Sequence, residues 1–384
     1  MISRATVEVL TELRQKLHQH AELSGAEFKT QQIIRGFLEQ NCPSAAVTPI
    51  AETGLLVSFS TTESGPGLLF RSDIDALPIL DRIDADYRSL QNGVGHKCGH
   101  DGHATILCGL ALHLHEHPPE AARVSLLFQP AEETGEGAKR VLATLLQDQQ
   151  LFDFVFALHN IPGEELGRVF CKVGPITTAV ISMIITLEGR RAHAAEPWHA
   201  INPSLAIGNI LAAAHSLEEQ NKHSDNFAIV TPVYLRVGSP DYGISPADAE
   251  LHFTLRCKES RLLDEKVNKF RTLVNDIAQQ ANLSVDYHYL QAFEPCINEQ
   301  KAVAMIADAA AGAALSLTEM ESSFSWGEDF GLFTQHFKGA LFGIGAGETV
   351  AQLHDETYDF PDALIAPAVE MFKAILKSTA TYHV

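Results

Sequence analysis

Four short segments carry side chains that bind divalent metals. Cys98-Gly99-His100 offers a thiolate and an imidazole, Glu132-Glu133 offers carboxylates, and histidines stand at positions 159 and 354. Thiolate, imidazole and carboxylate ligands suit zinc and related metals, and a spare glutamate beside them is typical of a hydrolytic site. The ligand count suits two metal ions that share a bridging group, with the candidates Cys98, His100, Glu133, His159 and His354.

The two glutamates are expected to differ in role. Adjacent residues in an extended segment point in different directions, so one carboxylate can bind metal while the other faces the substrate. A carboxylate near activated water can accept its proton and then donate it to a leaving amine. The alternative is a solvated acidic pair on a surface loop, which the preceding apolar run and Pro130 weigh against.

Each metal candidate has an ordinary alternative. Cys98 could be a buried, inert thiol, and His100 or His103 could be an imidazole satisfied within a polar network. Cys98 and His100 could also act together as the nucleophile and base of a thiol hydrolase. That hypothesis leaves Glu133, His159 and His354 without a purpose, so the full set favours a metal centre.

Short apolar runs predict strands at residues 55–60, 68–72, 124–128 and 154–158. One helix is predicted before these strands, beginning at a Ser24–Glu27 capping box, and another lies between them over residues 103–117. This alternation indicates an α/β fold with a mixed, mostly parallel sheet flanked by helices. Active sites lie beyond the carboxyl ends of such strands, where Asp73, Glu132, Glu133 and His159 are expected.

The pattern changes from about residue 179. Strands and helices in the order β-α-β-β-α-β over residues 179–291 predict an inserted ferredoxin-like α+β domain. Afterwards a helix over 302–314, a strand over 340–344 and a helix over 363–377 resume the first pattern. We therefore expect a catalytic domain formed by residues 1–178 and 292–384, and a second domain formed by residues 179–291.

Composition excludes several classes of function. A formal net charge of −20 argues against binding to nucleic acid, which needs basic surfaces. The chain has no apolar run long enough to span a membrane, and its first residues lack the apolar core of a signal peptide, so a cytoplasmic protein is predicted. The six cysteines form no Cys-x-x-Cys pair, and no disulfide framework is expected.

The motifs together resemble those of a known enzyme family. The chain is similar to metal-dependent amidohydrolases that cleave N-acyl amino acids, the hippurate hydrolase and indole-acetyl-amino-acid hydrolase branch of the aminoacylase/carboxypeptidase family. The resemblance spans nearly the whole chain in the family's order. The matching stretches are residues 17–24 (LHQHAELS), 71–78 (RSDIDALP), 98–103 (CGHDGH), 129–133 (QPAEE), 158–160 (LHN), 189–195 (GRRAHAA), 328–330 (EDF) and 353–354 (LH).

This resemblance implies a role for each matching residue. Glu132 would be the general base and acid, and His193 would polarise the scissile carbonyl, often in the active site of a dimer partner. Asp75 would orient a ligand imidazole. The inserted domain would be a lid that also forms a homodimer contact, and the substrate would be an N-acyl amino acid. Two divalent ions, zinc or manganese, would be held by Cys98, His100, Glu133, His159 and His354.

Three positions depart from the family pattern, and the one at Gly243 bears on the substrate. Gly243 stands where the family usually has an asparagine that contacts substrate, Ala21 replaces a usual proline, and Asn160 replaces a usual apolar residue. Arg256 is a further candidate for binding a substrate carboxylate, because an arginine fork suits that group. The altered loop at Gly243 leaves open a non-catalytic, metal-binding dimer as an alternative function.

Overall fold

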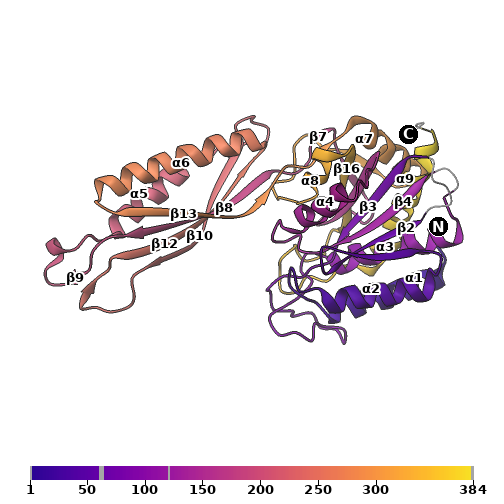
Figure 1. Ribbon diagram of the computed structural model, residues 1–384, viewed down its shortest axis with the longest axis horizontal. Helices are drawn as coiled ribbons and strands as arrows, with labels where there is room; N and C mark the ends of the chain where they lie inside the picture. The colour runs from indigo at the N-terminus through magenta and orange to yellow at the C-terminus, as the bar shows by residue number, and fades with distance from the viewer. Residues whose placement is uncertain (1, 60–64, 120–121, 382–384) are drawn as a thin grey trace. The chain divides into compact units, whose positions relative to one another are not determined.

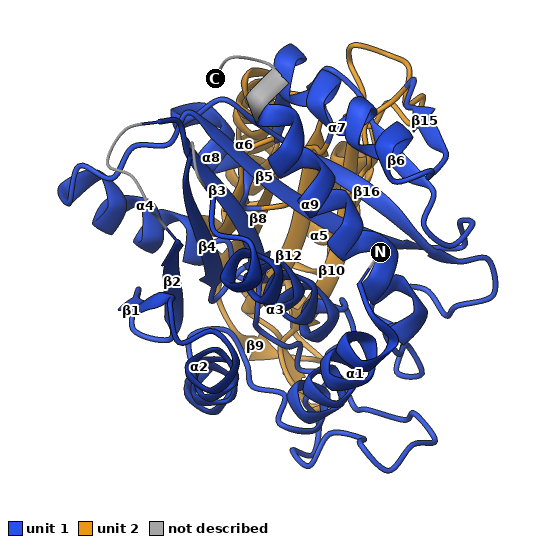
Figure 2. Cartoon of the chain, turned by 90° about the vertical axis from the view of Figure 1, so that its right-hand side faces the viewer, with its two compact units in different colours: residues 1–176, 296–321, 329–384 blue, residues 177–295, 322–328 orange. Residues whose placement is uncertain are grey.

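The computed structural model describes residues 2–59, 65–119 and 122–381, and the chain divides into two compact units. Unit 1 comprises Met1–Ile176, Cys296–Glu321 and Asp329–Val384. Unit 2 comprises Thr177–Pro295 and Ser322–Glu328 (Figure 2). Among the described residues, no helix combines the length and apolarity needed to cross a membrane.

Unit 1 contains an eight-stranded mixed sheet in the order β1-β2-β4-β3-β5-β16-β6-β15. Its four central strands, β4, β3, β5 and β16, run parallel to one another, and β1 and β2 continue the sheet antiparallel. The mixed, mostly parallel sheet predicted from the sequence is therefore confirmed. The strands are β1 (Ala46–Ile50), β2 (Gly54–Phe59), β3 (Gly67–Asp73), β4 (Arg123–Gln129), β5 (Phe154–Pro162), β6 (Val169–Cys171), β15 (Leu317–Glu319) and β16 (Gly339–Gly347).

Helices cover this sheet and bury its apolar side chains. Helix α3 contacts β3 and β4 and also packs against α1 and α9, so that α3 is buried along most of its length (Figure 2). Its position beneath the sheet explains why its sequence is apolar nearly all round. The helices of unit 1 are α1 (Arg4–Gln19), α2 (Phe28–Asn41), α3 (His100–Glu116), α4 (Gly137–Gln147), α7 (Gln300–Gly312), α8 (Gly331–His336), α9 (Ile365–Thr381) and the short η2 (Asp362–Leu364); β7 (Gly174–Pro175) pairs with β14 (Ile297–Asn298).

Three boundaries near the site differ from the sequence prediction. His159 was expected just after a strand, but β5 continues to Pro162 because residues 159–162 still pair with β16. Helix α3 begins at His100, three residues earlier than predicted. The expected capping box does not form: α2 begins at Phe28 without a side-chain cap, and the Ser24 hydroxyl donates to Asp75 instead. Position 60 of the predicted strand 55–60 lies outside the described residues.

Unit 2 has the predicted ferredoxin-like arrangement. Its antiparallel sheet has the order β10-β12-β8-β13, and α5 and α6 pack on one face of it (Figure 1). Alternate residues of β12 are buried, as a strand with one helix-covered face requires. The elements are β8 (Ala179–Glu188), β10 (Ala228–Val237), β12 (Asp248–Cys257), β13 (Ser284–Phe293), α5 (Ser204–His215), α6 (Ser260–Gln280), the short η1 (Pro197–His199), and β9 (Ala192–His193) paired with β11 (Ile244–Ser245).

Candidate metal centre and active site

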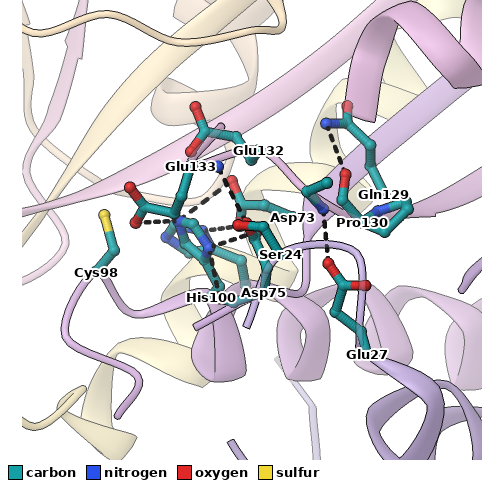
Figure 3. A network of polar contacts seen from close by, with 12 residues as sticks. Ser24, Glu27, Asp73, Asp75, Cys98, His100, Gln129, Pro130, Glu132 and Glu133 are labelled. Atoms are coloured by element: carbon teal, nitrogen blue, oxygen red, sulfur yellow. Dashed lines mark hydrogen bonds and ion pairs between the residues drawn. The ribbon is translucent and has the colours of Figure 1, made fainter. Parts of the chain in front are cut away.

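The predicted metal-binding side chains of unit 1 come together in space. In each of three overlapping groups, one possible ligand atom per residue lies within 4.8 Å of the others. Figure 3 shows Cys98 and His100, from one segment of the chain, converging with Glu133 from another. The groups are Cys98 with His100 and His159, Cys98 with Glu133 and His354, and His100 with Glu132 and Glu133.

His100 is held with one ring nitrogen directed at this cluster. Gly99, which precedes α3, has a φ of +93°, and a Cβ there would lie 2.8 Å from the Asn160 side chain, so glycine is required. The Nδ1 atom of His100 bonds to the Asp75 backbone oxygen at 2.9 Å and to Asp75 Oδ1 at 3.2 Å. These bonds hold Nδ1 on the side of Asp75, so that Nε2 is the nitrogen that faces the cluster and could bind a metal.

Two buried atoms of the cluster have no hydrogen-bond partner among the described residues. These atoms, His100 Nε2 and Glu133 Oε1, lie 3.9 Å apart. Glu133 Oε1 is also 3.9 Å from Nε2 of His354, a residue whose backbone has a φ of +67°. Buried polar atoms are normally satisfied, and a cation between these atoms would satisfy them. The donor set therefore fits a bound divalent metal.

The pKa values in the metal-free protein follow from burial. Burial raises the pKa of the Glu133 carboxyl to about 7 and raises the pKa of the Cys98 thiol well above its ordinary range. Burial and the neighbouring His103 lower the pKa of His159 to about 3. His159 is therefore a neutral imidazole, the form that binds metal. A thiol with a raised pKa is a poor nucleophile, which disfavours the thiol-hydrolase hypothesis.

His159 also presents one nitrogen to the cluster. Its Nδ1 donates to the backbone oxygen of Asn160 at 3.0 Å, and its Nε2 lies 3.5 Å from Cys98 Sγ. The bond at Nδ1 fixes the ring and leaves Nε2 on the side of the thiol. The imidazole and the thiol are both buried and lie side by side, so they can bind the same soft divalent metal ion.

His103 lies beside the cluster but is engaged elsewhere. Its Nδ1 bonds to Asp73 Oδ1 at 2.6 Å and its Nε2 to Asn160 Oδ1 at 2.5 Å. Asn160 Nδ2 in turn donates to the Tyr358 hydroxyl at 2.6 Å, and Arg71 donates to Asp73 at 2.8 Å. With both nitrogens used, His103 belongs to a polar network that supports the ligands. Motif spacing could not reveal Tyr358, because its contact with Asn160 joins distant segments.

The two glutamates are held by different backbone contacts. Both follow β4 directly after Ala131, whose φ is +53°. Glu132 is 6% exposed, and its Oε1 accepts from the backbone N–H of Asp329 at 3.4 Å. The backbone N–H of Glu133 donates to Asp75 Oδ2 at 3.0 Å. The turn therefore separates the pair, and Asp75 contacts both His100 and the Glu133 backbone (Figure 3).

The remaining predicted site residues belong to unit 2. His193 is exposed in β9, which pairs with β11 directly after Gly243. A Cβ at Gly243 would meet only the Asp241 carboxylate, at 3.6 Å, so this position has room for a side chain. Arg256 in β12 is partly buried and donates to the Ser325 backbone oxygen at 3.4 Å, and among the residues described it has no carboxylate partner.

Fold and site together indicate a metal-dependent amidohydrolase. The family model described as "Peptidase family M20/M25/M40" matches residues 69–378, and the chain belongs to this family. It is 32% identical over 337 residues to an N-acetyl-L-cysteine deacetylase of Bacillus subtilis, covering 87% of this chain and 79% of the relative. A second N-acetylcysteine deacetylase of that organism is 28% identical, covering 97% of both chains.

Solved structures agree with this assignment. A dinuclear metal-binding peptidase of the M20 family from Bacillus subtilis superposes with a TM-score of 0.82 at 25% identity, covering 100% of both chains. A putative aminohydrolase from Staphylococcus aureus gives a TM-score of 0.84 at 22% identity over 97% of both chains, and shows the same fold. The family resemblance noted in the sequence is therefore confirmed.

Proposed function

We propose that this enzyme hydrolyses the amide bond of small N-acyl amino acids, with N-acetylcysteine as the first substrate to test. The observation that carries the proposal is the pair of buried, unpartnered atoms, His100 Nε2 and Glu133 Oε1, beside the spare carboxylate of Glu132. The deacetylase relatives support the acetyl group and the amino acid.

Each residue of unit 1 then has a task. Two divalent ions, zinc or manganese, would supply Lewis acidity to the carbonyl and to the attacking water. The Glu132 carboxylate takes a proton from that water while the water oxygen forms a bond to the carbonyl carbon. Glu132 then delivers the proton to the amide nitrogen, the C–N bond breaks, and the products are a carboxylic acid and a free amino acid. The ligands would be Cys98, His100, Glu133, His159 and His354.

Unit 2 would act as a lid and as the contact of a homodimer. Its outer strand β10 exposes apolar side chains, which single subunits rarely leave uncovered on a strand edge. His193 would donate a hydrogen bond to the carbonyl oxygen in the partner's active site as negative charge develops there. The exposed apolar residues of β10 are Val233 (58%), Tyr234 (45%), Leu235 (45%) and Val237 (40%).

A mixing experiment tests the dimer and the role of His193 together. Glu132→Gln and His193→Ala homodimers should each be nearly inactive. After subunit exchange, a heterodimer should regain one working site, formed by the intact Glu132 of one chain and the intact His193 of the other. Recovered hydrolysis together with a dimer mass by light scattering supports the proposal. A monomer, or no recovery after demonstrated exchange, contradicts it.

Arg256 would bind the substrate carboxylate. A partly buried guanidinium without an acidic partner is a ready site for an anionic group, and arginine recognises carboxylates through two parallel hydrogen bonds. Substrates whose carboxylate is replaced by a carboxamide should therefore have a higher KM with the wild-type enzyme. With Arg256→Met the two substrates should differ little.

The proposed reaction is tested by a substrate panel on metal-free protein. The panel comprises N-acetyl and N-benzoyl amino acids, dipeptides and the matched carboxamides, with zinc, manganese or cobalt added back. Hydrolysis that appears only after metal addition supports the amidase and identifies its acyl group. Bound metal without hydrolysis would favour the non-catalytic dimer, and activity that resists chelators but not thiol reagents would favour the thiol hydrolase.

A further inference from the structure

The turn that carries Glu132 and Glu133 contains a strained residue. Ala131, directly before Glu132, has a φ of +53°, a conformation that residues with a Cβ rarely adopt. Such strain persists only where surrounding contacts enforce it, and it gathers at functional sites. The contacts that hold Ala131 therefore also determine the position of the next residue, Glu132.

Glu27 supplies the contact on the amide side of Ala131. Its carboxylate is fully buried, and Oε1 accepts from the backbone N–H of Ala131 at 2.8 Å. Oε1 also accepts from the Gly25 N–H at 2.8 Å, and Oε2 accepts from the Thr53 hydroxyl at 2.6 Å. Figure 3 shows Glu27 reaching the segment between Pro130 and Glu132. None of these partners is a cation, so the carboxylate's burial is compensated by hydrogen bonds alone.

The carbonyl side of Ala131 is held separately. Its oxygen accepts from the Gly137 N–H at 3.0 Å and from the Thr134 hydroxyl at 3.2 Å. Gly137 begins α4, and Thr134 lies in the same turn as the glutamates. The Glu27 bond thus ties the amide of Ala131 itself to a distant segment, the start of α2.

We propose that Glu27 is a positioning residue for catalysis, which holds Ala131 at positive φ so that the Glu132 carboxylate meets the reacting water and nitrogen. This inference rests on the proposed hydrolysis. Among the described residues, the hydrogen-bond partners of Glu27 include no candidate metal ligand, and Glu27 acts on the site through the Ala131 peptide group. Glu133 is fixed independently through the bond from its N–H to Asp75, so metal binding does not depend on Glu27.

The expected signature is a loss of kcat without a loss of binding. Glu27→Ala should lower kcat about 10- to 100-fold, because a shift near 1 Å in a reacting group costs up to about 10² in rate. KM and the metal content should stay within about twofold. Glu27→Gln should retain most activity, because its amide oxygen can still accept from Ala131 while its NH₂ group donates to the Thr53 hydroxyl. Thr53→Val is the matched control, since it removes a Glu27 bond that does not involve Ala131.

Two further variants separate positioning from general destabilisation. Glycine adopts positive φ without strain, so Ala131→Gly should restore part of the rate lost in Glu27→Ala. In a Glu132→Gln background, Glu27→Ala should change the residual rate less than about twofold, because the group being positioned is already gone. If Glu27→Ala fails to fold, Ala131→Val, which disfavours the same turn, should show the same loss and the same non-additivity.

The measurements are kcat, KM, bound metal and thermal unfolding for each variant, all on the metal-loaded enzyme. An equal loss of rate with and without Glu132, loss of metal from Glu27→Ala, or a comparable loss in Thr53→Val would overturn the inference. If the wild-type enzyme hydrolyses a substrate and Glu27→Ala has the same kcat, only the positioning role is refuted. A wild-type enzyme that hydrolyses no member of the panel would refute the proposed function, and this role with it.

Discussion

Glu132→Gln is expected to lower kcat by about 10²–10⁴-fold while leaving the metal content unchanged. The amide keeps the size of the side chain and can still accept from the Asp329 N–H. It cannot take a proton from water or deliver one to the leaving nitrogen, so only the chemical step suffers. The measurement is kcat and KM on the best substrate of the panel, with metal determined by elemental analysis.

The adjacent glutamate is the matched control for this variant. Glu133→Gln changes the same chemical group one residue along, but it removes a carboxylate oxygen that lies 3.9 Å from two imidazole nitrogens. We expect it to lose metal and to regain some activity at high metal concentration, which Glu132→Gln should not do. If Glu132→Gln loses metal while Glu133→Gln keeps it, the two roles are reversed. If neither substitution changes the rate, the proposed mechanism is wrong.

Most elements of both sheets were predictable because their apolar patterns reflect burial directly. The runs over residues 68–72 and 124–128 are buried central strands, and a central parallel strand is covered on both faces. The alternation in residues 250–256 reflects a strand with one covered face. The sequence order of strands and helices in residues 179–291 then fixes the ferredoxin-like topology.

The candidate ligands were recognisable from residue type, but their supporting contacts were not. Cys98, His100 and Glu133 stand in short motifs, and parallel strands bring such motifs to one edge. The bonds from Arg71 to Asp329 and from Asn160 to Tyr358 join segments far apart in sequence, and no local pattern indicates them.

Glu27 shows how a local pattern can predict the wrong contact. Ser24–Glu27 has the sequence of a capping box, and a helix does begin there. Tertiary contacts nevertheless compete for both side chains: the Ser24 hydroxyl donates to Asp75, and the Glu27 carboxylate accepts from Ala131. Local capping contributes only weakly to helix stability. Hydrogen bonds to partners elsewhere in the fold replace it when the side chain is buried and needs them.

The affinity of the metal-free protein for zinc is expected to increase steeply with pH. Metals bind the thiolate and the carboxylate, so every proton held by these groups must leave on binding. Burial raises the pKa of Cys98 well above its ordinary range and the pKa of Glu133 to about 7. Burial lowers the pKa of His100, but the neighbouring Asp73 carboxylate outweighs it and holds that pKa well above its ordinary range, so His100 also gives up a proton. Between pH 7 and 8 binding therefore expels about two protons, and between pH 6 and 7 it expels more than two.

This proton release sets the expected slope. Each released proton contributes about tenfold in affinity per pH unit, so the dissociation constant should fall about 100-fold from pH 7 to 8 and by more from pH 6 to 7. Competition with a chromophoric chelator measures the affinity, and calorimetry in buffers of different ionisation heat counts the protons. Cys98→Ser is the control, because without the thiol the slope should decrease by about one proton. An affinity independent of pH would show that Cys98 is not a ligand, since a buried thiol cannot bind metal without giving up its proton.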